Sequence, residues 1–200
     1  MLYAAGRTDA GVHAIGQVVS FQTAHKLASE RFATGINAYL PDDIAVRISE
    51  EVPETFNARF DSVSKRYGYT VVCARLRVPL LRNVAWHVRQ SLDIEAMQQA
   101  AQCLLGEHDF ESFRSVHCDA EHARRYIFNI TITSETRGPN VELVHFMYHG
   151  NAFCRLMCRI LTGTLCEVGT HKSAVANVAA VLAARDRRLA GPTAPAWGLT

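Results

Sequence analysis

The chain has 200 residues, of which 48% are hydrophobic and 20% are charged. This composition is ordinary for a folded globular protein and excludes disorder as the default state, while the length allows one large domain or two small ones. The 21 basic and 19 acidic side chains leave a net charge of only +2. Any affinity for nucleic acid must therefore come from local basic clusters, such as Lys65–Arg66 or Arg124–Arg125.

Near the start of the chain, the segment from Gly6 to His13 places a polar triplet between two glycines. Gly6 and Gly11 allow backbone angles closed to other residues, so the chain can turn sharply and present the Asp9 carboxylate at a rim. Arg7 lies two residues away and favours a charged carboxylate. Such a carboxylate can serve as a nucleophile or a general base. On this segment alone, a turn aspartate that bonds its own backbone is the commoner interpretation.

Hydrophobic periodicity predicts the elements of the next part of the chain. Apolar residues at i, i+4 and i+8 predict a helix over residues 29–40, between two strands at 17–22 and 44–48. Alternation from residue 62 to residue 74 predicts a long strand in the middle of a sheet. Residues 75–90 show no clean period, and we interpret them as a crossover between two halves, 1–75 and 76–200.

The second half is predicted to hold three helices and an antiparallel strand pair, in the order helix 93–105, strand 125–133, strand 141–148, a helix capped by Asn151 and a helix over 173–185. Asp93 is expected to cap the first of these helices. A turn at residues 138–140 joins the two strands. Antiparallel pairs with helices on one side indicate an α+β fold.

The six cysteines show no CxxC pair and no regular disulfide spacing. Cys154 and Cys158 are four residues apart on a predicted helix, but no second pair stands at a zinc-site spacing, so we expect no metal. Reduced thiols are typical of the cytoplasm. We find neither an N-terminal signal nor an apolar stretch that would span a membrane, and expect a cytoplasmic protein without a membrane anchor.

The run GRTDAGVHAIGQVVSF at residues 6–21 resembles the signature loop of the tRNA pseudouridine synthase A family. Further matches follow in the family's order along nearly the whole chain: residues 37–46, 56–60, 65–69, 106–113, 151–159 and 163–169. The resemblance implies two ferredoxin-like (RRM-like) halves whose antiparallel sheets join across a basic cleft. Family members carry a further strand and helix before the signature, so we expect the first half to be incomplete, with exposed apolar surface, and the end to stop short of a final strand.

The resemblance also implies the chemistry and its residues. Asp9 would be the catalytic carboxylate that isomerises uridine to pseudouridine in the tRNA anticodon stem-loop (positions 38 to 40). Tyr67 matches a tyrosine that packs against the base, Arg7 an arginine associated with base flipping, and Arg159 an arginine that reaches the aspartate from the other half. No cofactor and no metal are implied, and the expected partners are tRNA and a second copy of the chain in a homodimer.

Several alternatives stay open at this point. From the residues alone, Tyr67 could be a core residue of a sheet face, and Arg7 and Arg159 could be solvated charges. A truncated, inactive chain of the same family could bind RNA or its partner subunit without turnover. An unrelated hydrolase that uses Asp9 on a glycosidic bond would need a second carboxylate as its acid, and none stands near Asp9 in the sequence. Whether Asp9 acts as a nucleophile or as a base is also undecided.

Overall fold

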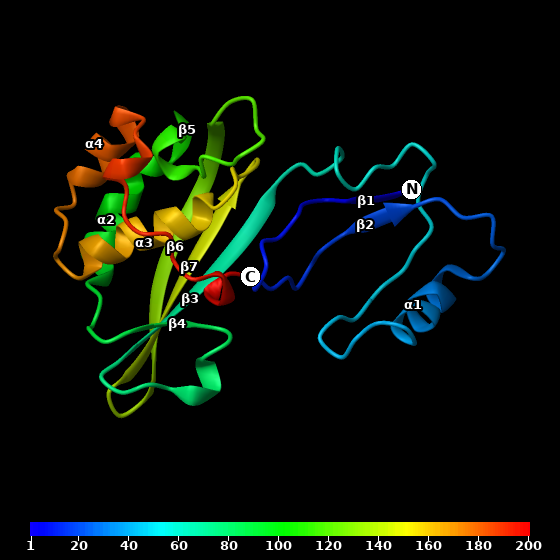
Figure 1. Cartoon of the computed structure of the whole chain (residues 1–200), viewed down its shortest axis with the longest axis horizontal. Coiled ribbons are helices and arrows are strands. Elements are labelled where there is room, and N and C mark those ends of the chain that lie inside the picture. The colour runs from blue at the N-terminus through cyan, green and yellow to red at the C-terminus, as the bar shows by residue number, and fades with distance from the viewer. The chain divides into compact units, whose positions relative to one another are not determined.

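The computed structural model describes all 200 residues, which form two compact units. Unit 1 comprises residues 1–7 and 16–62, and unit 2 comprises residues 8–15 and 63–200. The short segment 8–15, which contains Asp9, therefore belongs to unit 2, although both of its flanks belong to unit 1. The elements are labelled in Figure 1.

Unit 2 is built on a five-stranded sheet in the order β4-β3-β7-β6-β5. Its strands are β3 (Lys65–Ala74), β4 (Trp86–Val88), β5 (Gly106–Asp109), β6 (Arg124–Gly138) and β7 (Val141–Gly150). β3 lies inside this sheet, as predicted, and pairs antiparallel with β7 along its whole length. Its other neighbour, β4, runs parallel to it. The sheet is therefore mixed, and the prediction of purely antiparallel sheets is wrong.

The mixed topology comes from the segment predicted as a crossover. Residues 75–85 do carry the chain back along the sheet, but they end in β4, which the sequence pattern did not reveal. A parallel neighbour requires such a return of the chain before the second strand begins. The short β5 was also missed. The α+β class itself is confirmed.

Three helices cover one face of this sheet: α2 (Ile94–Ala101), α3 (Met157–Gly169) and α4 (Asn177–Ala184) (Figure 1). Alternation along β3 directs Tyr69 and Val71 into the core between sheet and helices. α3 lies at the centre of this core, because nearly every one of its positions is buried. Burial of a large apolar side chain stabilises the fold by about 1.5–3 kcal/mol, so α3 is firmly held.

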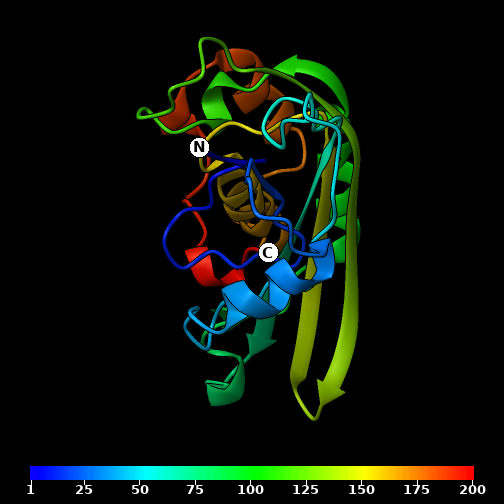
Figure 2. The same cartoon turned by 90° about the vertical axis from the view of Figure 1, so that its right-hand side faces the viewer.

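The strands β6 and β7 form a long hairpin whose turn lies beyond the helices (Figure 2). The predicted turn at residues 138–140 is confirmed. Gly138 has φ 145° and Asn140 has φ 59°, both in the region that favours glycine and asparagine. The predicted strand pair is therefore correct, with β6 longer than expected.

Unit 1 contains a two-stranded antiparallel ribbon and one helix: β1 (Leu2–Ala4), β2 (Val19–Phe21) and α1 (Ser29–Asn37). The helix confirms the prediction, although it ends before residue 40. No strand forms at residues 44–48. The Asn37 side chain donates to Val46 O over 2.8 Å and accepts from Val46 N over 2.7 Å, so it uses the backbone groups that a strand would offer to a neighbour.

The two predicted helix caps have different outcomes. Asp93 caps α2, because its Oδ1 accepts from Ala96 N over 2.9 Å. Asn151 caps no helix; its Oδ1 accepts from Tyr126 N over 3.0 Å and from Ala152 N over 2.7 Å. α3 begins only at Met157. The last helix, α4, begins at residue 177 rather than 173.

Short 3-10 turns complete the chain at Pro79–Leu81, Gln102–Leu104, Glu111–Phe113, Arg187–Leu189 and Ala196–Gly198. None of the helices combines the length and the apolar character needed to cross a bilayer.

Candidate active site

The segment 8–15, called the Asp9 loop below, is a tight turn. Val12 N donates to Asp9 O over 3.0 Å, and Gly11 between them has φ 82°. A residue with a Cβ rarely adopts that angle, so the glycine is required here. Gly6, by contrast, has no positive φ, so only one of the two predicted glycine turns is used in this way. The Val12 side chain packs against the core of unit 2 and anchors the loop.

The other end of the loop is fixed by segments far away in the sequence. His13 N donates to Leu199 O over 3.0 Å, and His13 Nε2 lies 2.7 Å from Asn83 O. Leu199 is itself held, because Thr200 exchanges two backbone hydrogen bonds of 2.8 Å with Gly68 of β3. The segment at residues 199–200 thus runs beside β3 and binds the Asp9 loop through the backbone of His13.

Two arginines contact the Asp9 carboxylate. Arg159 Nη1 donates to Asp9 Oδ2 over 3.2 Å, and Arg155 Nε lies 3.8 Å from Asp9 Oδ1. The first distance is a hydrogen-bonded ion pair, whereas the second is too long for a hydrogen bond. The Arg159 side chain is 15% exposed and also donates from Nε to Ala194 O over 2.7 Å. Asp9 is 29% exposed, so solvent reaches the carboxylate, while the arginine that binds it is the more buried of the two.

An aromatic pair borders the carboxylate. Tyr67 of β3 meets Phe153 edge-to-face, with ring centroids 5.3 Å apart. Burial raises the pKa of the Tyr67 phenol, and the nearby Cys158 thiol and Asp9 carboxylate raise it further. Tyr67 therefore keeps its proton at neutral pH and remains a neutral hydrogen-bond donor beside Asp9.

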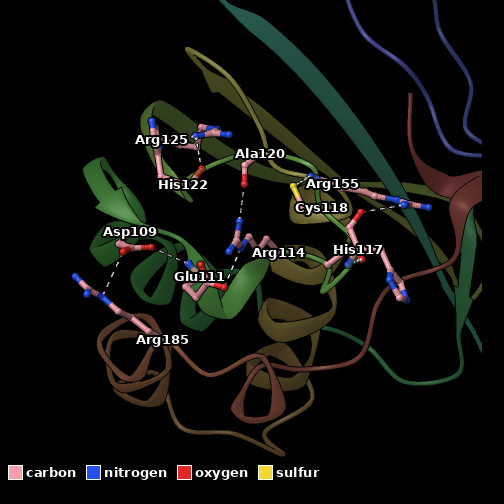
Figure 3. A network of polar contacts seen from close by, with 11 residues as sticks. Asp109, Glu111, Arg114, His117, Cys118, Ala120, His122, Arg125, Arg155 and Arg185 are labelled. Atoms are coloured by element: carbon pink, nitrogen blue, oxygen red, sulfur yellow. Dashed lines mark hydrogen bonds and ion pairs between the residues drawn. The ribbon is translucent and has the colours of Figure 1, made fainter.

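Arg155 is a residue of this site that the sequence reasoning missed. The loop at residues 115–118 holds it at three points. Arg155 N donates to Cys118 Sγ over 3.4 Å and Arg155 Nη1 donates to His117 O over 3.1 Å (Figure 3). Arg155 O accepts from Ser115 N over 3.0 Å. Its spacing of four from Arg159 could have suggested a shared helix face. That reading would fail, because the intervening Leu156 has φ 65° and α3 begins after it.

The thiols near the site differ in their electrostatics. Burial raises the pKa of Cys158 well above its usual value. Burial on its own would raise the pKa of the Cys118 thiol. Hydrogen bonds from the backbone of Ala120 and Arg155 and from the Cys154 thiol outweigh burial, so the pKa of Cys118 is lowered. All six cysteines are free, and no group of three or more His, Cys, Asp or Glu side chains is placed to hold a metal ion.

Of the four residues predicted for the site, the structure brings three together: Asp9, Tyr67 and Arg159. The fourth, Arg7, belongs to unit 1, and its side chain is exposed. No carboxylate other than Asp9 takes part in the contacts of Arg155 or Arg159. The contacts therefore join a single carboxylate and two arginines, with Tyr67 close by.

Comparison of the sequence with known protein families identifies the class of protein. The sequence model of the family described as tRNA pseudouridine synthase matches residues 1–61 and 100–200. The chain therefore belongs to the tRNA pseudouridine synthase family. Asp9 and both arginines of the site lie inside the matched ranges, whereas Tyr67 lies between them.

Individual relatives agree with this assignment. The chain is 43% identical over 198 residues to tRNA pseudouridine synthase A of Geotalea uraniireducens (strain Rf4), an alignment that covers 99% of this chain and 79% of the relative. It is 47% identical over 195 residues to the protein of that name from Myxococcus xanthus, with 98% and 72% covered. For Shigella boydii serotype 4 (strain Sb227) the identity is 45% over 198 residues, with 99% and 72% covered. The family resemblance drawn from the motifs is confirmed.

Proposed function

We propose that this chain is a tRNA pseudouridine synthase that isomerises uridine to pseudouridine in the anticodon stem-loop, with Asp9 as its catalytic carboxylate. The observation that carries the proposal is the hydrogen-bonded pair of Asp9 and the partly buried Arg159, set at the rim of unit 2 within a chain of this family. The reaction breaks the bond between uracil N1 and ribose C1′ and forms a bond from C5 to C1′. N1 gains a proton and C5 loses one, so composition is unchanged.

The residues of the site divide the work of this reaction. Asp9 either attacks C1′ or removes a proton from the ribose, and Arg159 fixes the carboxylate in one orientation through its bond to Oδ2. The target uridine must leave its stack to reach the carboxylate. Tyr67, already in an edge-to-face contact with Phe153, offers a ring against which the extruded base can pack. Arg7 fills or holds the space that the base leaves.

The proposal extends to the architecture and the partners. We expect two ferredoxin-like halves with a basic cleft, a cytoplasmic protein, and a homodimer across which tRNA lies. Large apolar side chains left exposed in unit 1, including Leu2, Val19 and Phe21, support an interface of this kind. Recognition of RNA by shape over a broad surface is consistent with a dimer.

The test is tritium release from tRNA labelled at uracil C5, compared between the parent chain and Asp9→Asn. We expect release by the parent and none by the variant, because an amide is neither a nucleophile nor a base of comparable strength. Asp42→Asn, an exposed aspartate of unit 1, is the matched control and should retain activity. Release by Asp9→Asn would contradict the assignment. Free uracil as product would favour a hydrolase, and salt-sensitive tRNA binding by a silent parent would favour an inactive binding chain.

A further inference from the structure

The two arginines at Asp9 are placed in very different surroundings. The Arg159 side chain is 15% exposed, and its hydrogen bonds go to Ala194 O and to Asp9. The Arg155 side chain is 53% exposed, and the one hydrogen bond of its guanidinium goes from Nη1 to His117 O. A guanidinium has five N–H donors in a planar fork, so most donors of Arg155 are unused.

Despite its exposure, Arg155 is held in position. The loop 115–118 binds its backbone N–H and its Nη1 (Figure 3), and also its backbone carbonyl. That loop is braced in turn by Arg114, whose Nη1 donates to Ala120 O over 2.9 Å and whose Nε donates to Glu111 Oε1 over 2.8 Å. An exposed cation held in this way loses little conformational entropy on binding a ligand.

We propose that Arg155 binds a backbone phosphate of the RNA beside the target uridine. This inference rests on the proposed function, which places ribose C1′ of that uridine against the Asp9 carboxylate. The phosphates on either side of the nucleotide are only a few bonds from C1′, so one of them comes within reach of the neighbouring guanidinium. The planar fork of arginine matches two phosphate oxygens.

The contact with Asp9 does not by itself explain why Arg155 is held in this position. Asp9 is already oriented by the hydrogen bond from Arg159, and the 3.8 Å approach of Arg155 Nε adds no second hydrogen bond. The Arg155 side chain is 53% exposed, so a ligand can reach its unused donors from solvent. The oxygens of a phosphate would accept hydrogen bonds from the donors of Arg155 that the protein leaves unused.

The decisive experiment measures tRNA binding in the Asp9→Asn background, where no turnover occurs and the ion pair between residues 9 and 155 is already removed. Fluorescence anisotropy would compare Asp9→Asn alone with the same chain carrying Arg155→Gln, Arg155→Lys or Arg137→Gln. Arg137, an exposed arginine paired with Glu135 on the β6–β7 hairpin, is the matched control for loss of one charge.

We expect Arg155→Gln to weaken tRNA binding about tenfold, which corresponds to about 1.4 kcal/mol, because a charge-assisted hydrogen bond to the phosphate is lost. The slope of log affinity against log salt should fall in magnitude by roughly 0.7–0.9, the loss of one phosphate contact. Arg155→Lys should keep the slope but bind more weakly than arginine, since the fork is lost. Arg137→Gln should change neither quantity.

Two outcomes overturn the inference, and they differ from failure of the proposed function. If Arg155→Gln showed the same affinity and the same salt slope as the Arg137→Gln control, Arg155 would make no phosphate contact, while the proposed synthase function would stand. A fall in kcat for Arg155→Gln in the otherwise native chain, with KM and slope unchanged, would make Arg155 a positioning residue for Asp9 instead. If the parent bound no tRNA at all, the proposed function and this inference would fail together.

Discussion

The two units of the chain differ in how many of their side chains are buried. Unit 2 has a large core, in which side chains such as Phe146 and Tyr148 are fully buried between the sheet and three helices, and a second, smaller cluster that includes Val72 and Leu143. In unit 1 the one buried residue is Ala58, and α1 buries none of its residues. Its apolar side chains lie at the surface instead, as expected for the first half. Elements of the same kinds thus occur in both units, but only unit 2 has the packing that fixes the positions of side chains such as Asp9 and Arg159.

The largest expected effect comes from truncating one phenylalanine in each unit, which tests whether the two units differ in packing. Phe146→Ala, at a fully buried position of β7, should lower the free energy of unfolding by about 3–5 kcal/mol, because it leaves a cavity in the core. Phe21→Ala, at a position 43% exposed in β2, should cost less than about 1 kcal/mol. Urea unfolding followed by tryptophan fluorescence and circular dichroism would compare them. Equal losses would mean that unit 1 has a core of its own.

A second contrast concerns adding a methyl group to a glycine. A Cβ at Gly198 would lie 2.6 Å from the Tyr69 ring, so Gly198→Ala should destabilise the protein by about 1–3 kcal/mol and disturb the segment that holds the Asp9 loop. A Cβ at Gly35 of α1 would meet nothing within 4 Å, so Gly35→Ala should stabilise that helix by up to about 1 kcal/mol. Thermal midpoints and amide hydrogen exchange in α1 would show the two signs. Destabilisation by Gly35→Ala would mean that α1 is packed more tightly than its exposure indicates.

The smallest expected effect distinguishes the two helix starts. α2 begins at Asp93, whose side chain accepts from Ala96 N, whereas α1 begins after Ala28 with no side-chain cap. Asp93→Ala should cost about 1 kcal/mol, and Ala28→Ser should add a few tenths to about 1 kcal/mol to the stability of α1. Denaturation midpoints for the first variant and helical ellipticity for the second are the measurements. A neutral Asp93→Ala would mean that tertiary packing alone determines the start of α2.

Prediction from the sequence succeeded where the pattern that determines an element lies within the element itself. The alternation along β3, the glycine–asparagine turn between β6 and β7, and the cap at Asp93 all act within a few residues, and all three are present. It failed at the short strands β4 and β5, which have too few residues to show a period. It also failed at residues 44–48, where alternation predicted a strand but Asn37 binds the backbone of Val46.

The site follows the same rule. Asp9 and Arg159 lie in motifs that resemble a family, so they could be proposed before any coordinates were known. Arg155 could not, because its position depends on Leu156 breaking the helical spacing and on a loop 37 residues earlier in the chain that accepts its N–H. Contacts at such separations leave no pattern in a single sequence.

The placement of the Asp9 loop has a consequence during protein synthesis. Asp9 precedes Arg159 by 150 residues, and Leu199, whose carbonyl holds His13, is made later still. The loop therefore leaves the ribosome long before the groups that orient it. In the nascent chain the Asp9 carboxylate therefore lacks its hydrogen bond from Arg159, and the loop gains its contact with Leu199 only after residues 196–200 have been made and have docked beside β3.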